Sequence, residues 1–180
     1  LEAMEERQLS IAGKTYALPE PFFVLATQNP IEVEGTYTLP EAQLDRFLFK
    51  IKVKYPSRED EFEICRRQTT DYATAPEQVF DGARVIQMQS TVRKVIVSQH
   101  VYAAAIDLAR WTRPEESRLP SDLQKMVKWG AGPRASINLL KAAQARAILH
   151  RRVHATTEDI AQVAAPILRH RIVPTFNAEA

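Results

Sequence analysis

The chain has 180 residues, of which 45% are hydrophobic and 26% are charged, a composition that suits one ordinary globular domain or two small ones. Its 24 lysines and arginines against 22 aspartates and glutamates leave a formal charge of +2, which is too small to indicate a nucleic-acid surface by itself. The single cysteine, Cys65, excludes an intrachain disulfide, and its isolation disfavours a metal site. The lone cysteine favours a reducing, cytoplasmic location. The sequence has no apolar run of about 18 residues, so we expect no membrane span.

A glycine-containing segment near the start, Gly13-Lys14-Thr15, copies the end of a phosphate-binding loop. The full pattern, G-x-x-x-x-G-K-S/T, needs another glycine where this sequence has Gln8. Such a loop must also lead into a helix, which the two prolines of residues 16–21 prevent. We predict instead a hairpin of Gln8–Ala12 and Thr15–Leu18, with Gly13-Lys14 as its turn.

The next segment, Phe22–Ala26, is apolar and ends abruptly in polar residues, the last of which is Asn29. This pattern predicts a buried strand with polar side chains at its C-terminal end, which is where ligands bind in an open α/β sheet. Residues 40–46 then read as a short helix that begins with a proline, and Phe47–Val53 as a second strand. From the residues alone, an asparagine before a proline is more often a turn residue than a catalytic one.

Three motifs in this region, ATQNP, EGTY and LPEAQLDRF, have the order and spacing found in the MoxR family of AAA+ ATPases, which the chain resembles over nearly its whole length. The resemblance implies that Asn29 is the sensor 1 residue, which orients the attacking water near the γ-phosphate of ATP. It also implies that Arg46 is the arginine finger, which acts on the ATP of a neighbouring subunit. Between them, Glu32 and Glu34 are candidates for a subunit interface, with a solvated acidic turn as an equal alternative.

The chain begins at Leu1 rather than at an initiator methionine, and its first seven residues read as the end of an amphipathic helix. We therefore expect it to be a fragment. In the MoxR family this segment follows the Walker B acidic pair, so the resemblance implies that the phosphate loop and the carboxylates that bind Mg²⁺ lie upstream of Leu1. It implies no metal ligand within the chain and no ATP hydrolysis by the chain alone.

Helical periodicity dominates the remainder of the chain. Ser57 and Asp60 form a helix-start signature for a helix to about Thr69, and weaker periodicity follows at 79–90. Four further helices are expected, which run from Ser98 to about Thr112, from Pro120 to Gly130, from Pro133 to about His150 and from Thr156 onward. The inward face of the third is expected to contain Ile137, Leu140, Ala143, Ala147 and Ile148. Since each apolar stripe needs a partner, we predict a small helical bundle.

Basic residues gather near the ends of the last two expected helices. They are Arg146, His150, Arg151, Arg152 and His154 in one cluster and Arg169, His170 and Arg171 in the other. We interpret both clusters as solvated helix ends, where cations are favourable, with a surface for an acidic partner as the alternative.

The stretch from Trp129 to Ser136 is the other segment that suggests chemistry. Its glycines let the backbone approach a neighbour closely, and Pro133 starts a helix that carries Arg134 in its first turn. The helix dipole disfavours a cation there unless a negative group lies opposite, which a phosphate would supply. The stretch resembles the sensor 2 motif of MoxR-type lids. Judged without the family, Arg134 and Arg46 could equally form ion pairs with neighbouring carboxylates.

The expected fold class is α/β followed by all-α: the C-terminal portion of an AAA+ P-loop NTPase core, then an all-helical lid bundle. We place the core at residues 1–56, a linker region at 57–80 and the lid at 81–180. The resemblance implies a protein that hydrolyses ATP with Mg²⁺ in a ring, a hexamer, and that remodels client proteins or inserts a cofactor into them.

Two alternatives stay open. The first is an AAA+ motor on nucleic acid, which is disfavoured because the expected hairpin, Gln8–Leu18, contains no basic residue except Lys14. The second, for the fragment alone, is a non-catalytic oligomerisation or binding module. We expect no direct contact with a membrane or a nucleic acid.

Overall fold

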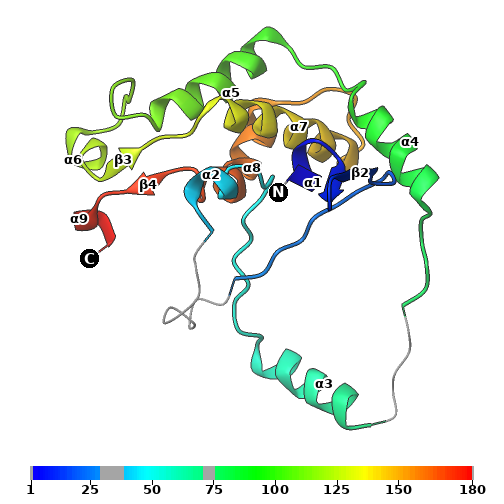
Figure 1. Ribbon diagram of the computed structural model, residues 1–180. Helices are drawn as coiled ribbons and strands as arrows, with labels where there is room; N and C mark the ends of the chain where they lie inside the picture. The colour runs from blue at the N-terminus through cyan, green and yellow to red at the C-terminus, as the bar shows by residue number, and fades with distance from the viewer. Residues whose placement is uncertain (1, 29–38, 71–75, 180) are drawn as a thin grey trace.

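The structure is a computed structural model that describes residues 2–28, 39–70 and 76–179. Its centre is formed by three helices that pack against one another: α5 (Gln99–Trp111), α7 (Pro133–Leu149) and α8 (Thr157–Leu168) (Figure 1). The buried core is rich in alanine, and these small side chains let the three helices approach one another closely. Its members include Val101, Ala105, Leu139, Ala143, Ala147, Ile160 and Ile167, none of which is more than 2% exposed. The predicted helical bundle is confirmed.

One expected core position on α7 is wrong. Ile137 is 50% exposed, whereas Leu139 is completely buried. The buried residues of α7 include Ala143 and Ala147, as predicted, and also Ala135, Leu139 and Ala142. The small alanines allow close contact with α5 and α8, so their face of α7 is the one that packs into the bundle. Ile137 lies on another face of α7, which lines a pocket.

Local capping sets the beginnings of several helices as the sequence predicts. The hydroxyl of Ser57 accepts a hydrogen bond from the backbone N–H of Asp60 at the start of α3 (Arg58–Thr69). Thr156 and Asp159 form a reciprocal capping box at the start of α8. The caps at Ser57 and Thr156 join residues three apart in the chain, which is why the sequence alone predicts them. Asp81 also caps α4 (Gly82–Val92), by accepting a hydrogen bond from the backbone N–H of Arg84, although this cap was not predicted.

The helix expected from Pro120 to Gly130 is wrong beyond its first turn. Helix α6 ends at Gln124 (Ser121–Gln124), and the chain continues as strand β3 (Val127–Trp129). This strand pairs antiparallel with β4 (Val173–Pro174), which is followed by the short helix α9 (Phe176–Glu179). The turn after α8 brings β4 alongside, and the hydrogen bonds of this long-range pairing replace those of the expected helix.

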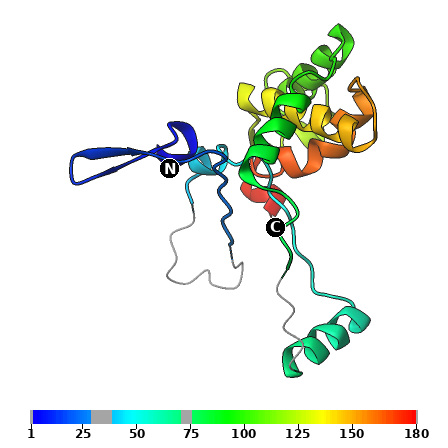
Figure 2. The same cartoon turned by 90° about the vertical axis from the view of Figure 1, so that its right-hand side faces the viewer.

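The predicted hairpin near the start of the chain is confirmed. After helix α1 (Glu2–Glu5), strands β1 (Gln8–Ile11) and β2 (Lys14–Ala17) pair antiparallel, and they project away from the helices (Figure 2). The turn residues are Ala12 and Gly13, one position earlier than expected, with φ of 50° and 77°. Positive φ at both central residues is typical of a two-residue hairpin turn, which glycine favours. Gly13 therefore belongs to a turn and not to a phosphate loop.

The two expected strands of the α/β core do not form among the described residues. Residues 22–28 and 47–53 have no ladder partner there, and Phe23, Leu25, Ile51 and Val53 are 73–92% exposed. A strand is defined by hydrogen bonds to a neighbour, so an apolar sequence by itself leaves such a segment extended and uncovered. Between them, the short helix α2 (Glu41–Leu44) is present as predicted, while α3 stands apart from the bundle (Figure 1). Within the described ranges, no helix has the length and apolar character needed to cross a bilayer.

Candidate functional site

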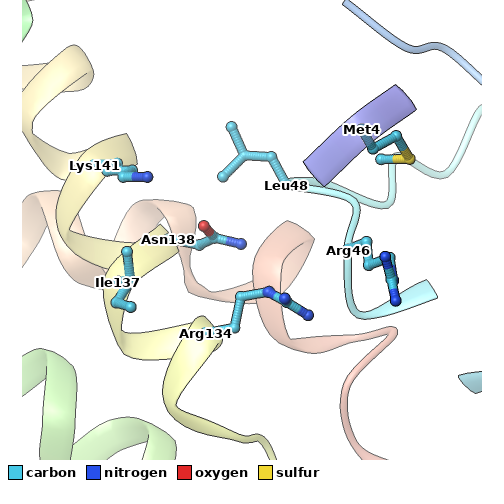
Figure 3. Close-up of a pocket in the computed structure, with 7 residues that line it drawn as sticks. All are labelled: Met4, Arg46, Leu48, Arg134, Ile137, Asn138 and Lys141. Atoms are coloured by element: carbon cyan, nitrogen blue, oxygen red, sulfur yellow. The ribbon is translucent and has the colours of Figure 1, made fainter. Parts of the chain in front are cut away.

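A pocket lies where α1, the segment after α2 and the first turns of α7 meet (Figure 3). Its volume is about 280 Å³, and three cationic side chains line it: Arg46, Arg134 and Lys141. The remaining lining residues are Met4, Leu48, Ile137 and Asn138. Cationic groups together with an amide suit a polyanion such as the phosphate groups of a nucleotide. Ligand pockets usually enclose about 300–1,000 Å³, so the described residues supply at most part of a nucleotide site.

Helix α7 contributes four side chains to this pocket from one face. Arg134, Ile137, Asn138 and Lys141 follow the spacing of three, four and seven residues that places side chains above one another on a helix. Gly132 takes the N-cap position and Pro133 the first helical position, where its missing N–H has no consequence. Arg134 therefore lies in the first turn of α7, directly after this proline.

The placement of this helix start depends on close packing against the end of α5. A Cβ atom on Gly130 would lie 2.5 Å from the backbone nitrogen of Arg113 and the carbonyl oxygen of Thr112, so only glycine fits there. The expectation that the glycines allow a close approach is thus confirmed at Gly130. It is wrong at Gly132, where a Cβ atom would meet nothing within 4 Å.

Arg134 is paired with a carboxylate from another part of the chain. One of its terminal nitrogens donates to Oδ2 of Asp45 at 2.9 Å, and the two side chains are 43% and 29% exposed. Asp45 therefore supplies the negative group that a cation in the first turn of a helix requires. As an ion pair that is partly open to water, this contact contributes little to stability by itself. Its consequence is geometric, because Asp45 directly precedes Arg46.

The opposite oxygen of Asp45 is held by a buried arginine. Oδ1 of Asp45 accepts a hydrogen bond of 2.8 Å from Nε of Arg171, whose side chain is 1% exposed. The neighbouring His170 is also buried, and its Nε2 lies 3.1 Å from the carbonyl oxygen of Phe47. Burial lowers the pKa of the Arg171 guanidinium from its usual value, while the carboxylate of Asp45 opposes this shift. The interpretation of His170 and Arg171 as a solvated helix end is wrong.

The other basic cluster is also more structured than expected. Arg146 and Arg152 donate to the carboxylate of Asp159, which is completely buried, at distances of 2.6 to 3.0 Å. The hydrogen bonds from Arg152, together with those from Thr156 and the charge of Arg152, hold the pKa of the Asp159 carboxyl well below its usual range, although burial opposes this shift. Arg146 and Arg152, two of the five basic residues predicted to be solvated, are therefore part of the fold of the bundle.

The structure brings two of the three predicted site residues together. Arg46 and Arg134 line the same pocket although they come from different parts of the chain. Asn29 lies outside the described residues, as do Glu32 and Glu34. Asn138 and Lys141 also line the pocket, and no motif marks them, although their spacing from Arg134 along one helix face is a usable signal.

The described residues offer ligands for phosphate rather than for a metal. Across residues 2–28, 39–70 and 76–179, no group of three or more His, Cys, Asp or Glu side chains could hold a metal ion. Three cations around one pocket would attract and orient phosphate oxygens, and Asn138 could accept or donate a hydrogen bond. The site is suited to binding and stabilising anionic charge.

Comparison with protein families and solved structures agrees with this geometry. The family described as "ATPase family associated with various cellular activities (AAA)" matches residues 1–49, and the AAA lid domain family matches residues 121–180. Chaperone MoxR1 of Mycobacterium tuberculosis is 41% identical over 99% of this chain and 47% of its own length. Protein MoxR of Methylorubrum extorquens is 31% identical over 96% of the chain and 53% of its own length.

A solved structure from Cytophaga hutchinsonii, described as a candidate ATPase, superimposes with a TM-score of 0.90 at 40% identity. It covers 99% of this chain, which in turn covers 54% of that structure. The chain thus spans about half the length of the relatives it matches. The matched families define the class of the protein as an AAA+ ATPase with its lid. Within that class, the chain belongs to the MoxR family.

Proposed function

We propose that this chain forms the sensor and lid part of a MoxR-type ATPase that hydrolyses ATP to ADP and phosphate with Mg²⁺. The active form is a ring, a hexamer in the cytoplasm, whose conformational changes remodel a client protein or insert a cofactor into it. The observation that carries the proposal is the pocket shared by Arg46 and Arg134, because both are the arginines that the family motifs mark.

ATP hydrolysis depends mainly on the stabilisation of negative charge in the transition state. Phosphoryl transfer spreads negative charge over the oxygens of the transferred group, and positioned cations stabilise that charge. In the proposed protein, Arg134 reaches the phosphates from the lid, and Arg46 acts as a finger on the ATP of the adjacent subunit. Asn29 orients the attacking water. The ligands of Mg²⁺ and the phosphate loop are proposed to lie upstream of Leu1, so the 180-residue chain alone does not hydrolyse ATP.

A substitution of Arg46 in the intact protein tests this function. Arg46→Ala should lower the rate of hydrolysis by about 10³ to 10⁵, the value of an arginine finger, while the affinity for ATP stays close to normal. Arg93→Ala is a matched control, because it removes an exposed arginine at the end of α4, away from the pocket.

Mixed rings test the position of the finger. If Arg46 acts on a neighbour, mixing Arg46→Ala subunits with subunits that carry a Walker A substitution should restore part of the activity, because some interfaces then combine an intact site with an intact finger. No restoration in rings shown to be mixed, or a large loss of ATP binding from Arg46→Ala alone, would contradict the proposed role.

A further inference from the structure

The carboxylate of Asp45 joins two arginines from two different segments. Its Oδ1 accepts from Nε of Arg171 at 2.8 Å, and its Oδ2 accepts from a terminal nitrogen of Arg134 at 2.9 Å. Each oxygen thus accepts a hydrogen bond from a different arginine, and the bond from the buried Arg171 fixes the orientation of the carboxylate. Arg134 then meets a carboxylate in a set orientation, and charge-assisted hydrogen bonds of this length are the strong, directional kind.

Arg171 also holds the backbone on both sides of Arg46. One terminal nitrogen of Arg171 donates to the carbonyl oxygens of Asp45 and Phe47, each at 2.6 Å. Its other terminal nitrogen donates to the carbonyl of Ile167 at 2.5 Å, within α8. The guanidinium therefore ties the residues before and after Arg46 to the C-terminal end of α8 in the lid.

A buried charge is a costly way to fasten two segments together. An apolar side chain could hold the end of α8 without the desolvation penalty of a guanidinium. The guanidinium of Arg171 donates both to the backbone carbonyls beside Arg46 and to the carboxylate of Asp45, which faces Arg134. Arg171 thus contacts the backbone beside Arg46, and it also contacts Asp45, which in turn contacts Arg134. These contacts connect Arg46 and Arg134, the two arginines that line the pocket.

We propose that Arg171 and Asp45 are positioning residues of the ATPase, which set Arg46 and Arg134 in a fixed relation to each other across the junction of lid and core. Neither residue touches the nucleotide in this scheme. Arg171 acts through the backbone of residues 45–47 and through Asp45, and Asp45 acts through Arg134. The inference rests on the proposed function, because it assumes that Arg46 and Arg134 act on phosphate.

A double-mutant cycle in the intact ATPase tests the link from Asp45 to Arg134. Asp45→Asn keeps the size of the side chain and the backbone carbonyls that Arg171 holds, but it turns an amide N–H₂ or a neutral oxygen toward Arg134. We expect kcat to fall about tenfold or more, the equivalent of one charge-assisted hydrogen bond. In an Arg134→Ala background, the same change should alter kcat by less than about twofold, because the group that Asp45 orients is gone.

The matched control is Glu41→Gln, which removes an exposed carboxylate from the same short helix. It should leave kcat and the KM for ATP unchanged. Thermal unfolding by circular dichroism establishes that each variant is folded. A purely structural role of Asp45 would instead give equal effects with and without Arg134, and additive losses in the cycle overturn the inference.

Arg171→Lys provides a second, independent measurement. Lysine keeps the positive charge but lacks the planar fork that reaches Asp45 and two carbonyls at once, so kcat should fall while the folded fraction at the assay temperature stays near that of the parent. If Arg46→Ala and Arg134→Ala themselves leave hydrolysis unchanged, the proposed function fails. If those two abolish it but Asp45→Asn and Arg171→Lys behave like Glu41→Gln, the positioning inference alone fails.

Discussion

The hydroxyl of Thr112 accepts a hydrogen bond of 2.8 Å from the backbone N–H of Ala131. Arg113 adds a second contact, from its Nε to the carbonyl oxygen of Ala131 at 3.0 Å. Together they fix the C-terminal end of α5 to the loop that leads into α7. Because Arg134 lies in the first turn of α7, this joint determines where its guanidinium stands over the pocket.

The two glycines of this loop should respond differently to substitution. Gly130→Ala places a Cβ atom 2.5 Å from backbone atoms of Thr112 and Arg113, which cannot give way as a flexible side chain would. We expect it to lower the free energy of unfolding by about 1–3 kcal/mol, as overpacking does, and to weaken ATP binding in the intact protein by displacing Arg134. Urea unfolding followed by tryptophan fluorescence measures the first effect.

Gly132→Ser is the matched control for this experiment. Gly132 has open space around it and occupies the N-cap of α7, where serine is a better residue than glycine by a few tenths of a kcal/mol. Stability should therefore be unchanged or slightly raised. Equal losses from both substitutions would show that the close approach at Gly130 does not control the joint.

The buried carboxylate of Asp159 should be the most sensitive polar group of the bundle. Asp159→Ala leaves the guanidinium groups of Arg146 and Arg152 without their partner and removes the capping box of α8. Breaking a fully buried pair costs about 3–5 kcal/mol, and since the two arginine side chains are 25% and 30% exposed we expect about 2–4 kcal/mol. Glu158→Ala, an exposed neighbour in the same turn, should cost less than about 0.5 kcal/mol.

The effect of Asp159 should also depend on pH with a defined sign. Because its folded pKa lies below the usual value of about 3.9, its contribution is complete above that value and is lost as the pH falls below it. The difference in unfolding free energy between the parent and Asp159→Ala should therefore narrow as the pH falls from about 4 to 3. A difference that stays constant over this range would mean that the ion pairs contribute nothing.

The sequence predicts those parts of the structure that depend on neighbouring residues. The caps at Ser57 and Thr156 are local, so their helices begin where expected. The pairing of β3 with β4 joins residues far apart in the chain, and no periodicity reveals it. An extended core segment such as Phe22–Ala26 has apolar residues but needs a neighbouring strand to become part of a sheet, which the described residues do not supply.

The candidate site shows the same division. Arg46 and Arg134 could be marked from motifs, and the first turn of α7 from its proline. The basic run that contains Arg171 has the composition of a solvated helix end, and its burial depends on the segment around Asp45 folding back onto α8. A long-range contact of this kind leaves no trace in local sequence.

The lid, residues 81–180, should fold without the rest of the chain. Every buried core residue in the described part of the protein lies between Val95 and Leu168, within that range. We expect a cooperative thermal transition by circular dichroism for this fragment, at a lower temperature than for the whole chain because Arg171 loses its contacts to residues 45–48. The complementary fragment, residues 1–80, should show no cooperative transition. A non-cooperative lid would contradict the proposed boundary.

His170 should make the stability of the chain fall in mild acid. Burial lowers the pKa of its imidazole, and the charges of Arg171 and Lys50 act in the same direction, while the hydrogen bond with the Phe47 carbonyl and the charge of Asp45 oppose them. Its Nε2 faces the carbonyl oxygen of Phe47, and its buried Nδ1 has no hydrogen-bond partner in the described part of the structure, so a second proton would be buried unpaired. The native state therefore resists protonation.

The sign of this pH dependence follows from the two states. Below a pH of about 6.5 the unfolded chain binds a proton at this position that the native chain does not, so the free energy of unfolding decreases as the pH falls from 7 to 5. The slope for one proton is at most about 1.4 kcal/mol per pH unit. His170→Gln keeps an N–H that can reach the Phe47 carbonyl but does not titrate, and it should flatten this slope. Equal slopes for the parent and His170→Gln in urea titrations would show that His170 accepts its proton as readily in the native state as in the unfolded one.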